Sequence, residues 1–260
     1  MTAPLLTYEM RGAVAFLRFH DPAHLNALSP EMCAALGTAL TRAEQEARAL
    51  VLGSHGRAFC AGANLTNVPI NLADPARDAG LFLEETLNPL ILHIRALSIP
   101  MVTAVRGAAA GAGVALALAG DMVVAGQSAY FYQAFCHLGL VPDAGCSHML
   151  VQTLGRVRAA ELMLLGEKLS AAQALDWGLI NRLVADEEVD ALALDLAARL
   201  ADGPKALGMI RQLTWSATDN DLPTQLQLER EMQKHASRTK DFVEGVTAFL
   251  EKRAPQFKNE

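Results

Sequence analysis

The sequence predicts an α/β fold, because apolar runs of strand length alternate with helical patterns through most of the chain. Ala49–Leu52, Met101–Val105 and Met122–Ala125 are typical of buried strands, and helical patterns lie between them. Strands that alternate with helices pair in parallel, since only a long return connection reaches a parallel neighbour. From about Asp186 the strand patterns stop and helical patterns follow one another, which predicts a helical C-terminal region.

The chain is expected to open with a β-hairpin and a helix. Leu5–Glu9 and Val14–Phe19 are short apolar runs with a turn between them. Ser29 then caps a helix whose apolar residues recur at helical spacing. Two further helices are expected, one around residues 81–97 and one from about residue 113.

Composition narrows the class of protein. The 260 residues suffice for one catalytic domain with an appendage. A formal net charge of -6 leaves no basic excess for a nucleic-acid backbone, so no nucleic-acid partner is expected. The four cysteines form no CxxC pair and no metal-finger spacing, which predicts free thiols, a reducing cytoplasm and no metal. The apolar run Val114–Ala119 is too short to span a membrane, so no membrane partner is expected.

Two segments of small residues follow predicted strands. Gly107–Ala115 joins a strand to a helix with mostly glycine and alanine, so a ligand atom can approach the backbone closely. Free amides at the start of that helix favour an anion, including a transient one such as an enolate oxygen. Gly56–Leu65 is the second such segment, and two convergent N–H groups are what an oxyanion hole requires. Tight packing between helix and strand is the alternative reason for small residues.

A dinucleotide-binding motif is not supported. Gly111 and Gly113 follow a predicted strand, but Leu116 stands where the third glycine is required. No acidic residue closes a second strand at the distance of about 20 residues that such a motif needs.

Five groups of residues, in order along nearly the whole chain, are similar to successive motifs of the crotonase (enoyl-CoA hydratase/isomerase) superfamily. They are Gly56–Leu65, Gly107–Asp121, Gly139–Gly145, Leu169–Ile180 and Glu244–Arg253. The resemblance implies a spiral of ββα units in residues 1–200 that holds an acyl-CoA site. It also implies that the helices of residues 201–260 make the contacts of a homotrimer or homohexamer. Coenzyme A then enters as part of the substrate, and no separate cofactor is expected.

The resemblance also implies roles for individual residues. The amides of Ala63 and Ala112 are the expected oxyanion donors. The segment His24–Ala27 is similar to the lining of the coenzyme A channel, and Phe249 and Lys252 are similar to residues that reach the adenosine phosphate from a neighbouring subunit. The full set of expected substrate-binding residues is His24, Leu25, Ala27, Ala61, Asn64, Leu65, Gly111, Gly113, Phe135, Phe249 and Lys252.

The sequence departs from the hydratases of this superfamily at two positions. Those hydratases carry two glutamates that hold water and move its proton, and the matching residues here are Ala115 and Phe135. Neither can act as an acid or base, which disfavours hydration. A 1,3-proton shift needs only one carboxylate, and Asp143 is the candidate, with a pKa raised by an apolar pocket of Leu140, Val141 and Phe135. Asp143 is alternatively an ordinary helix N-cap.

Ala115, Asp143 and the C-terminal Lys252–Phe257 together resemble the phenylacetate-pathway branch, which includes 1,2-epoxyphenylacetyl-CoA isomerase. Members of that branch isomerise a ring epoxide to an oxepin and move double bonds between the 3 and 2 positions of enoyl-CoA. An acyl-CoA isomerase is therefore the favoured function. A hydratase or thioester hydrolase with water held by Asp143 or His148 is one alternative, and a non-catalytic acyl-CoA-binding protein is another. No role for His137 or His148 follows from their type alone.

Overall fold

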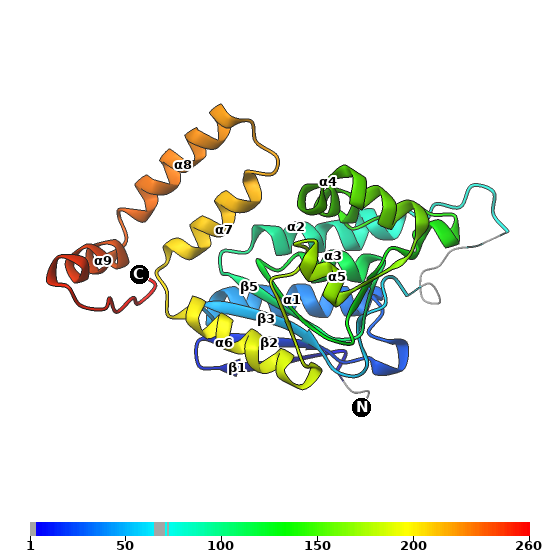
Figure 1. The fold of residues 1–260 in the computed structure, drawn as a ribbon, viewed down its shortest axis with the longest axis horizontal. Coiled ribbons are helices and arrows are strands. Elements are labelled where there is room, and N and C mark those ends of the chain that lie inside the picture. Colours follow the sequence, from blue (N-terminus) through cyan, green and yellow to red (C-terminus); the bar gives the residue numbers. More distant parts are fainter. Residues whose placement is uncertain (1–3, 65–70, 72) are drawn as a thin grey trace.

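Two β-sheets, a layer of helices and a helical C-terminal arm make up the computed structural model, which describes residues 4–64, 71 and 73–260 (Figure 1). Within these residues the first sheet has six strands in the order β1-β2-β3-β5-β7-β10. The hairpin partners β1 and β2 are antiparallel, as predicted, and the other neighbours pair in parallel. The strands are β1 Leu6–Arg11, β2 Val14–Phe19, β3 Ala49–Ser54, β5 Met101–Val105, β7 Met122–Gly126 and β10 Arg182–Val184.

A second sheet, which was not predicted, has four strands of three residues each in the order β4-β6-β8-β9 across the described residues. Gly56–Leu65 and Gly107–Ala115 were predicted as small-residue segments without a strand of their own, and each contributes one of these strands. Three successive turns (β3-β4-α2, β5-β6-α3 and β7-β8-α4) each add a strand to the first sheet, then one to the second, then a helix, which confirms the spiral of ββα units. The strands are β4 Ala58–Cys60, β6 Ala108–Ala110, β8 Tyr130–Tyr132 and β9 Lys168–Ser170.

The helices begin close to where the sequence predicts them. The Ser29 hydroxyl accepts a hydrogen bond from the Met32 N–H and caps the first helix. The helix expected around residues 81–97 consists of a π-helical turn, Leu83–Leu87, followed by α2. The α-helices are α1 Pro30–Glu46, α2 Asn88–Ala96, α3 Ala112–Leu118, α4 Cys146–Leu165, α5 Ala171–Asp176, α6 Val189–Ala201, α7 Ala206–Ser216, α8 Leu222–Ala236 and α9 Lys240–Glu251.

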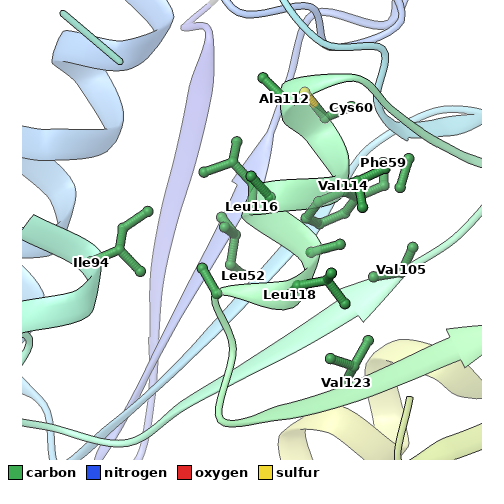
Figure 2. Close-up of a cluster of buried hydrophobic side chains, with 14 of the residues drawn as sticks. Leu52, Phe59, Cys60, Ile94, Val105, Ala112, Val114, Leu116, Leu118 and Val123 are labelled. Carbon is green, nitrogen blue, oxygen red and sulfur yellow. The ribbon is translucent and has the colours of Figure 1, made fainter. Parts of the chain in front are cut away.

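The first sheet is buried on both faces, which is usual for parallel strands covered by helices. Leu50 and Leu52 belong to a core cluster that includes side chains of α1, α2 and α3. Val51, one position along the strand, belongs to a second cluster that includes side chains of α6. Figure 2 shows α3 in the larger cluster, with Val114 and Leu116 among the buried side chains around it. The position of α3 is therefore fixed by core packing.

The C-terminal helices leave the body of the molecule as an arm (Figure 1). The first helix of the arm, α7, is anchored through Arg211, whose side chain is almost fully buried. Its Nε donates to Asp121 at 2.9 Å and its other nitrogens donate to backbone carbonyls at the end of α2. Trp215 donates to the same carboxylate at 2.9 Å. None of the helices in the described residues has the length and apolar character needed to cross a membrane.

Candidate active site

The two segments of small residues lie against each other. Strands β4 and β6 pair in parallel, which aligns the segments side by side. A Cβ atom at Gly113 would overlap the carbonyl oxygen of Cys60, and one at Gly62 would lie 2.8 Å from the carbonyl oxygen of Ala110. Figure 2 shows Cys60 beside Ala112 at the start of α3. Glycine is thus required by close backbone approach on both sides of the contact.

The amides of Ala63 and Ala112 belong to this contact. Ala63 forms an isolated bridge with Leu28, in which Leu28 N–H donates to Gly62 at 2.7 Å and the Leu28 carbonyl accepts from Asn64 at 2.9 Å. The two hydrogen bonds of this bridge are made by the backbones of Gly62 and Asn64, and the Ala63 N–H takes part in neither. Ala112 is the first residue of α3, where backbone N–H groups have no acceptor inside the helix. A Cβ at Gly62 would lie 3.5 Å from the Ala112 nitrogen, so the structure brings the two predicted donors into one place.

The segment His24–Ala27 runs beside the first of these segments. The Leu25 carbonyl accepts a hydrogen bond from Ala61 N–H at 3.1 Å. Asn26 is fully buried, and its amide nitrogen donates to the carbonyls of His55 and Ala58 at 2.9 and 2.8 Å. Leu25 and Asn26 both have left-handed backbone angles, which asparagine tolerates better than most residues. Asn26 fixes this turn, a role that the sequence pattern did not reveal.

Asp143 is a partly buried carboxyl group close to the same place. Burial raises the pKa of Asp143 to about 6. Its Oδ1 is buried and has no hydrogen-bonding partner among the described residues. The N-cap alternative is wrong, because Gly145 is the N-cap of α4 and no side chain caps that helix. Ala144, between the two, has a left-handed φ of 52°, a strained conformation that turns the chain sharply after Asp143.

The predicted apolar pocket around Asp143 is partly wrong. Leu140 and Val141 are 41% and 79% exposed, so these side chains do not enclose the carboxyl group. Phe135 is buried, and its ring would lie 3.5 Å from a Cβ at Gly111. Both exposed residues lie in the link between the 3-10 turn Ala134–Leu138 and α4, where apolar character alone could not predict burial.

Cys146 connects Asp143 to the turn before Ala112. Its thiol donates to the Gly111 carbonyl at 3.4 Å. Burial raises the pKa of Cys146 to about 12, and the negative charge of Asp143 contributes to the same effect. The carboxylate therefore lies near enough to the thiol to act on it electrostatically. Asp143 and the two predicted oxyanion donors thus border one region of the molecule.

Several predicted residues do not join this cluster within one chain. Phe249 and Lys252 stand at the end of α9, which lies at the far end of the arm from α3 (Figure 1). The His24 side chain is exposed and pairs with Asp21 at 2.9 Å. Leu65 lies outside the described residues. The contribution of Phe249 and Lys252 from a neighbouring subunit stays a prediction.

The histidines and cysteines near the site have structural surroundings. The ring of His137 contacts the Gly166 carbonyl at 3.0 Å, and His148 pairs with Asp219 at 3.3 Å. Burial raises the pKa of Cys60 to about 12, so this thiol stays protonated at neutral pH. These contacts and burial account for His137 and Cys60, whereas His148 also lines the cavity beside Ala144.

A cavity of about 330 Å³ is lined in part by Ala144, the residue that follows Asp143 in the chain. Ala144 and Met149 of the α4 region line it on one side, Ile91 and Leu92 of α2 on another, and Trp215 of α7 on a third. The exposed surface inside this cavity is mainly apolar. Its size and character suit a small hydrocarbon group.

Comparisons with known proteins show the family to which the chain belongs. The family described as "Enoyl-CoA hydratase/isomerase" matches residues 9–260. A 1,2-epoxyphenylacetyl-CoA isomerase of Escherichia coli is 44% identical over 97% of both chains. A Rhodobacter capsulatus protein named "Probable enoyl-CoA hydratase" is 42% identical over 99% of both.

Solved structures have the same fold. The crystal structure of an enoyl-CoA hydratase from a Polaromonas species superposes with a TM-score of 0.89 at 36% identity, covering 97% of this chain and 99% of the other. The fold and the paired small-residue segments define an acyl-CoA enzyme of the crotonase superfamily. The chain belongs to the enoyl-CoA hydratase/isomerase family.

Proposed function

We propose that this enzyme isomerises acyl-CoA thioesters through an enolate. The observation that carries the proposal is the placement of Asp143, a carboxyl group with a pKa raised to about 6 and an unpaired oxygen, beside the contact of the two small-residue segments. A pKa just below neutrality suits a group that must both accept and return a proton.

In the proposed reaction, the Asp143 carboxylate removes a proton from the carbon next to the thioester carbonyl. The electron pair of that C–H bond moves onto the carbonyl oxygen, which the amides of Ala63 and Ala112 stabilise. One such donor typically contributes about 3 to 4 kcal/mol to transition-state stabilisation. Asp143 then returns the proton two carbons away, and the double bond moves from the 3 to the 2 position. Atoms and charge balance without water or a cofactor.

The absence of a second acid or base at the two hydratase glutamate positions favours isomerisation over hydration. Ala115 and Phe135 occupy the positions of the two hydratase glutamates, and both side chains are buried and apolar. Addition of water requires one group to activate the oxygen and a source for the new carbon-bound proton. His148, the other candidate for holding water, lines the cavity that follows Asp143, with its Nε2 3.3 Å from Asp219 Oδ1. A single carboxylate is sufficient only for the proton shift.

The substrate is proposed to lie with its acyl end in the apolar cavity that follows Asp143 and its coenzyme A end along His24–Ala27. The Escherichia coli relative, by its name, acts on a ring epoxide, so a ring-epoxide acyl group is the second substrate class to test. Residues 201–260 are proposed to form a trimer contact, in which Phe249 and Lys252 reach the coenzyme A of a neighbouring subunit. The cytoplasm remains the proposed location.

The test is an assay of wild type and Asp143→Asn on a trans-3-enoyl-CoA, following formation of the conjugated 2-enoyl thioester by absorbance. A 2-enoyl-CoA is assayed in parallel for hydration, and a ring-epoxide thioester for isomerisation. The proposal predicts isomerisation without hydration, and a loss of at least about a hundredfold in the variant. Hydration by the wild type would favour the hydratase alternative that the Rhodobacter relative's name suggests. Binding of acyl-CoA with no turnover of either isomerase substrate would favour a non-catalytic binding protein.

A further inference from the structure

Gln133 is a buried amide to which the proposed reaction gives no role. It follows β8 directly, and its side chain is only 3% exposed. Neither its Nε2 nor its Oε1 has a hydrogen-bonding partner of good geometry among the described residues. More than nine in ten buried polar groups in proteins do have one, so an amide with two unpaired atoms calls for an explanation.

The backbone places Gln133 beside the candidate active site. Gly111 N–H donates to the Tyr132 carbonyl at 2.9 Å, so Gln133 adjoins the residue that holds the turn before Ala112. The Gln133 side chain also makes a hydrogen-bonding contact with the Cys146 thiol, which lowers the pKa of that thiol against the larger upward effect of burial. The same thiol responds to the charge of Asp143. Gln133 and Asp143 are thus both neighbours of Cys146, and both carry unpaired polar atoms.

Contact with the Cys146 thiol satisfies the Gln133 amide only weakly. The Cys146 thiol already donates to Gly111 at 3.4 Å, and sulfur is a weak acceptor. Asn26 shows how this protein pairs an amide with a purely structural role, because its side chain makes hydrogen bonds to Asp21, His55 and Ala58. By contrast, Gln133 has no backbone group to fix, and an apolar residue would fill the same space at a lower desolvation cost.

We propose that Gln133 is a specificity-determining residue that binds an oxygen atom of the acyl group near the carbon on which Asp143 acts. This inference deepens the proposed function and rests on its acyl-CoA site. An amide can donate to an epoxide, ether or hydroxyl oxygen and can accept from a hydroxyl group. A plain hydrocarbon acyl group would leave the amide unpaired, and sites built around a polar contact discriminate strongly against substrates that lack it.

The experiment measures equilibrium binding of two thioesters that cannot isomerise and that differ by one oxygen, phenylacetyl-CoA and 2-hydroxyphenylacetyl-CoA. Dissociation constants are determined by calorimetry for the wild type, Gln133→Leu and Gln133→Met. The wild type is expected to bind the hydroxylated thioester at least about tenfold more tightly. Both variants are expected to lose that preference while their affinity for phenylacetyl-CoA stays within about threefold of the wild type.

Two controls keep the outcomes distinct. Thermal unfolding of each variant establishes that it is folded, and Gln133→Met preserves the length of the side chain if Gln133→Leu does not fold. Equal affinity of the wild type for both thioesters, or an equal loss for both in the variants, would overturn the inference. Because neither ligand can be isomerised to a product, the result does not depend on isomerase activity. Failure of the wild type to bind either thioester would instead remove the acyl-CoA site, and this inference with it.

Discussion

Asp143 carries an energetic cost in the folded protein. Burial raises its pKa from 3.8 to about 6, so above pH 6 the chain holds a negative charge in surroundings that disfavour it. The native state binds this proton more tightly than the unfolded chain does. The resulting stabilisation is complete below the unfolded pKa near 4 and is lost as pH rises through about 6.

Asp143→Asn should therefore make the protein more stable at pH 8 while it removes activity. A shift of about two pKa units corresponds to about 3 kcal/mol, which is the upper bound for the gain in unfolding free energy. The gain should shrink towards zero as pH falls to about 4. Urea unfolding of both proteins across this range measures it. An equal stability difference at every pH would show that the carboxyl group is not perturbed by burial.

At the scale of elements, the contact between the two small-residue segments depends on glycine. Gly113→Ala would place a Cβ atom on the Cys60 carbonyl, so α3 must shift away from β4. We expect unfolding free energy to fall by about 1 to 3 kcal/mol, because overpacking forces backbone shifts. Catalytic rate should fall at least about a hundredfold, because the Ala112 amide moves with the helix.

Gly37→Ala is the matched control for that substitution. Gly37 lies inside α1, and a Cβ there meets nothing within 4 Å. Its unfolding free energy should rise by up to about 1 kcal/mol, because alanine is the better helix former, and its activity should not change. Similar activity in Gly113→Ala and Gly37→Ala would mean that α3 does not position a catalytic donor.

Arg211 should make a large contribution to stability, because it anchors the C-terminal arm to the body of the molecule. Arg211→Met leaves the Asp121 carboxylate and three backbone carbonyls without their buried donor. Removal of one partner of a buried pair typically costs about 3 to 5 kcal/mol of unfolding free energy. Arg230→Met, which removes an exposed pair with Glu231, should cost less than about 1 kcal/mol. Chemical denaturation measures both, and equal losses would contradict the anchoring role.

Sequence patterns predicted the helices and strands that are long enough for a recurring or continuous apolar pattern to be recognised. The apolar runs at Met101–Val105 and Met122–Ala125 are strands of the first sheet, within one residue of the predicted ends. The strands of the second sheet have three residues each, too few for an alternating pattern, and Ala108–Ala110 has no β-branched residue. Their pairing depends on contacts between distant segments, which no local pattern encodes.

For the molecule as a whole, the arm carries several large apolar side chains that are mostly exposed in the single chain, and grouped exposed apolar residues are typical of protein contacts. Phe249 is 81% exposed, Leu250 73% and Leu222 71%. We expect sedimentation to show a trimer or a pair of trimers. Phe249→Asp should dissociate it and raise the KM for acyl-CoA at least about tenfold, while Val157→Asp on α4 should change neither. A monomeric wild type would contradict the predicted role of residues 201–260.

Only those residues of the candidate site that lie in family-like motifs were predicted from the sequence. Ala63, Ala112 and Asp143 lie in segments similar to family motifs, and the structure brings those segments together. No sequence motif indicates which side chains are buried or which remote residues form hydrogen bonds. The unpaired amide of Gln133 and the fixing of the His24–Ala27 turn by Asn26 became visible only in three dimensions.

The claim that Asp143 forms the enolate is tested most directly by hydrogen exchange on a thioester that cannot isomerise. Phenylacetyl-CoA is incubated in D₂O with wild type or Asp143→Asn, and loss of the proton signal next to the carbonyl is followed by NMR. We expect the wild type to catalyse exchange, with a rate that rises with pH through about 6 as the carboxyl group ionises. The variant should be at least about a hundredfold slower. Equal exchange rates in the two proteins would contradict the account, because some other group would then be the base.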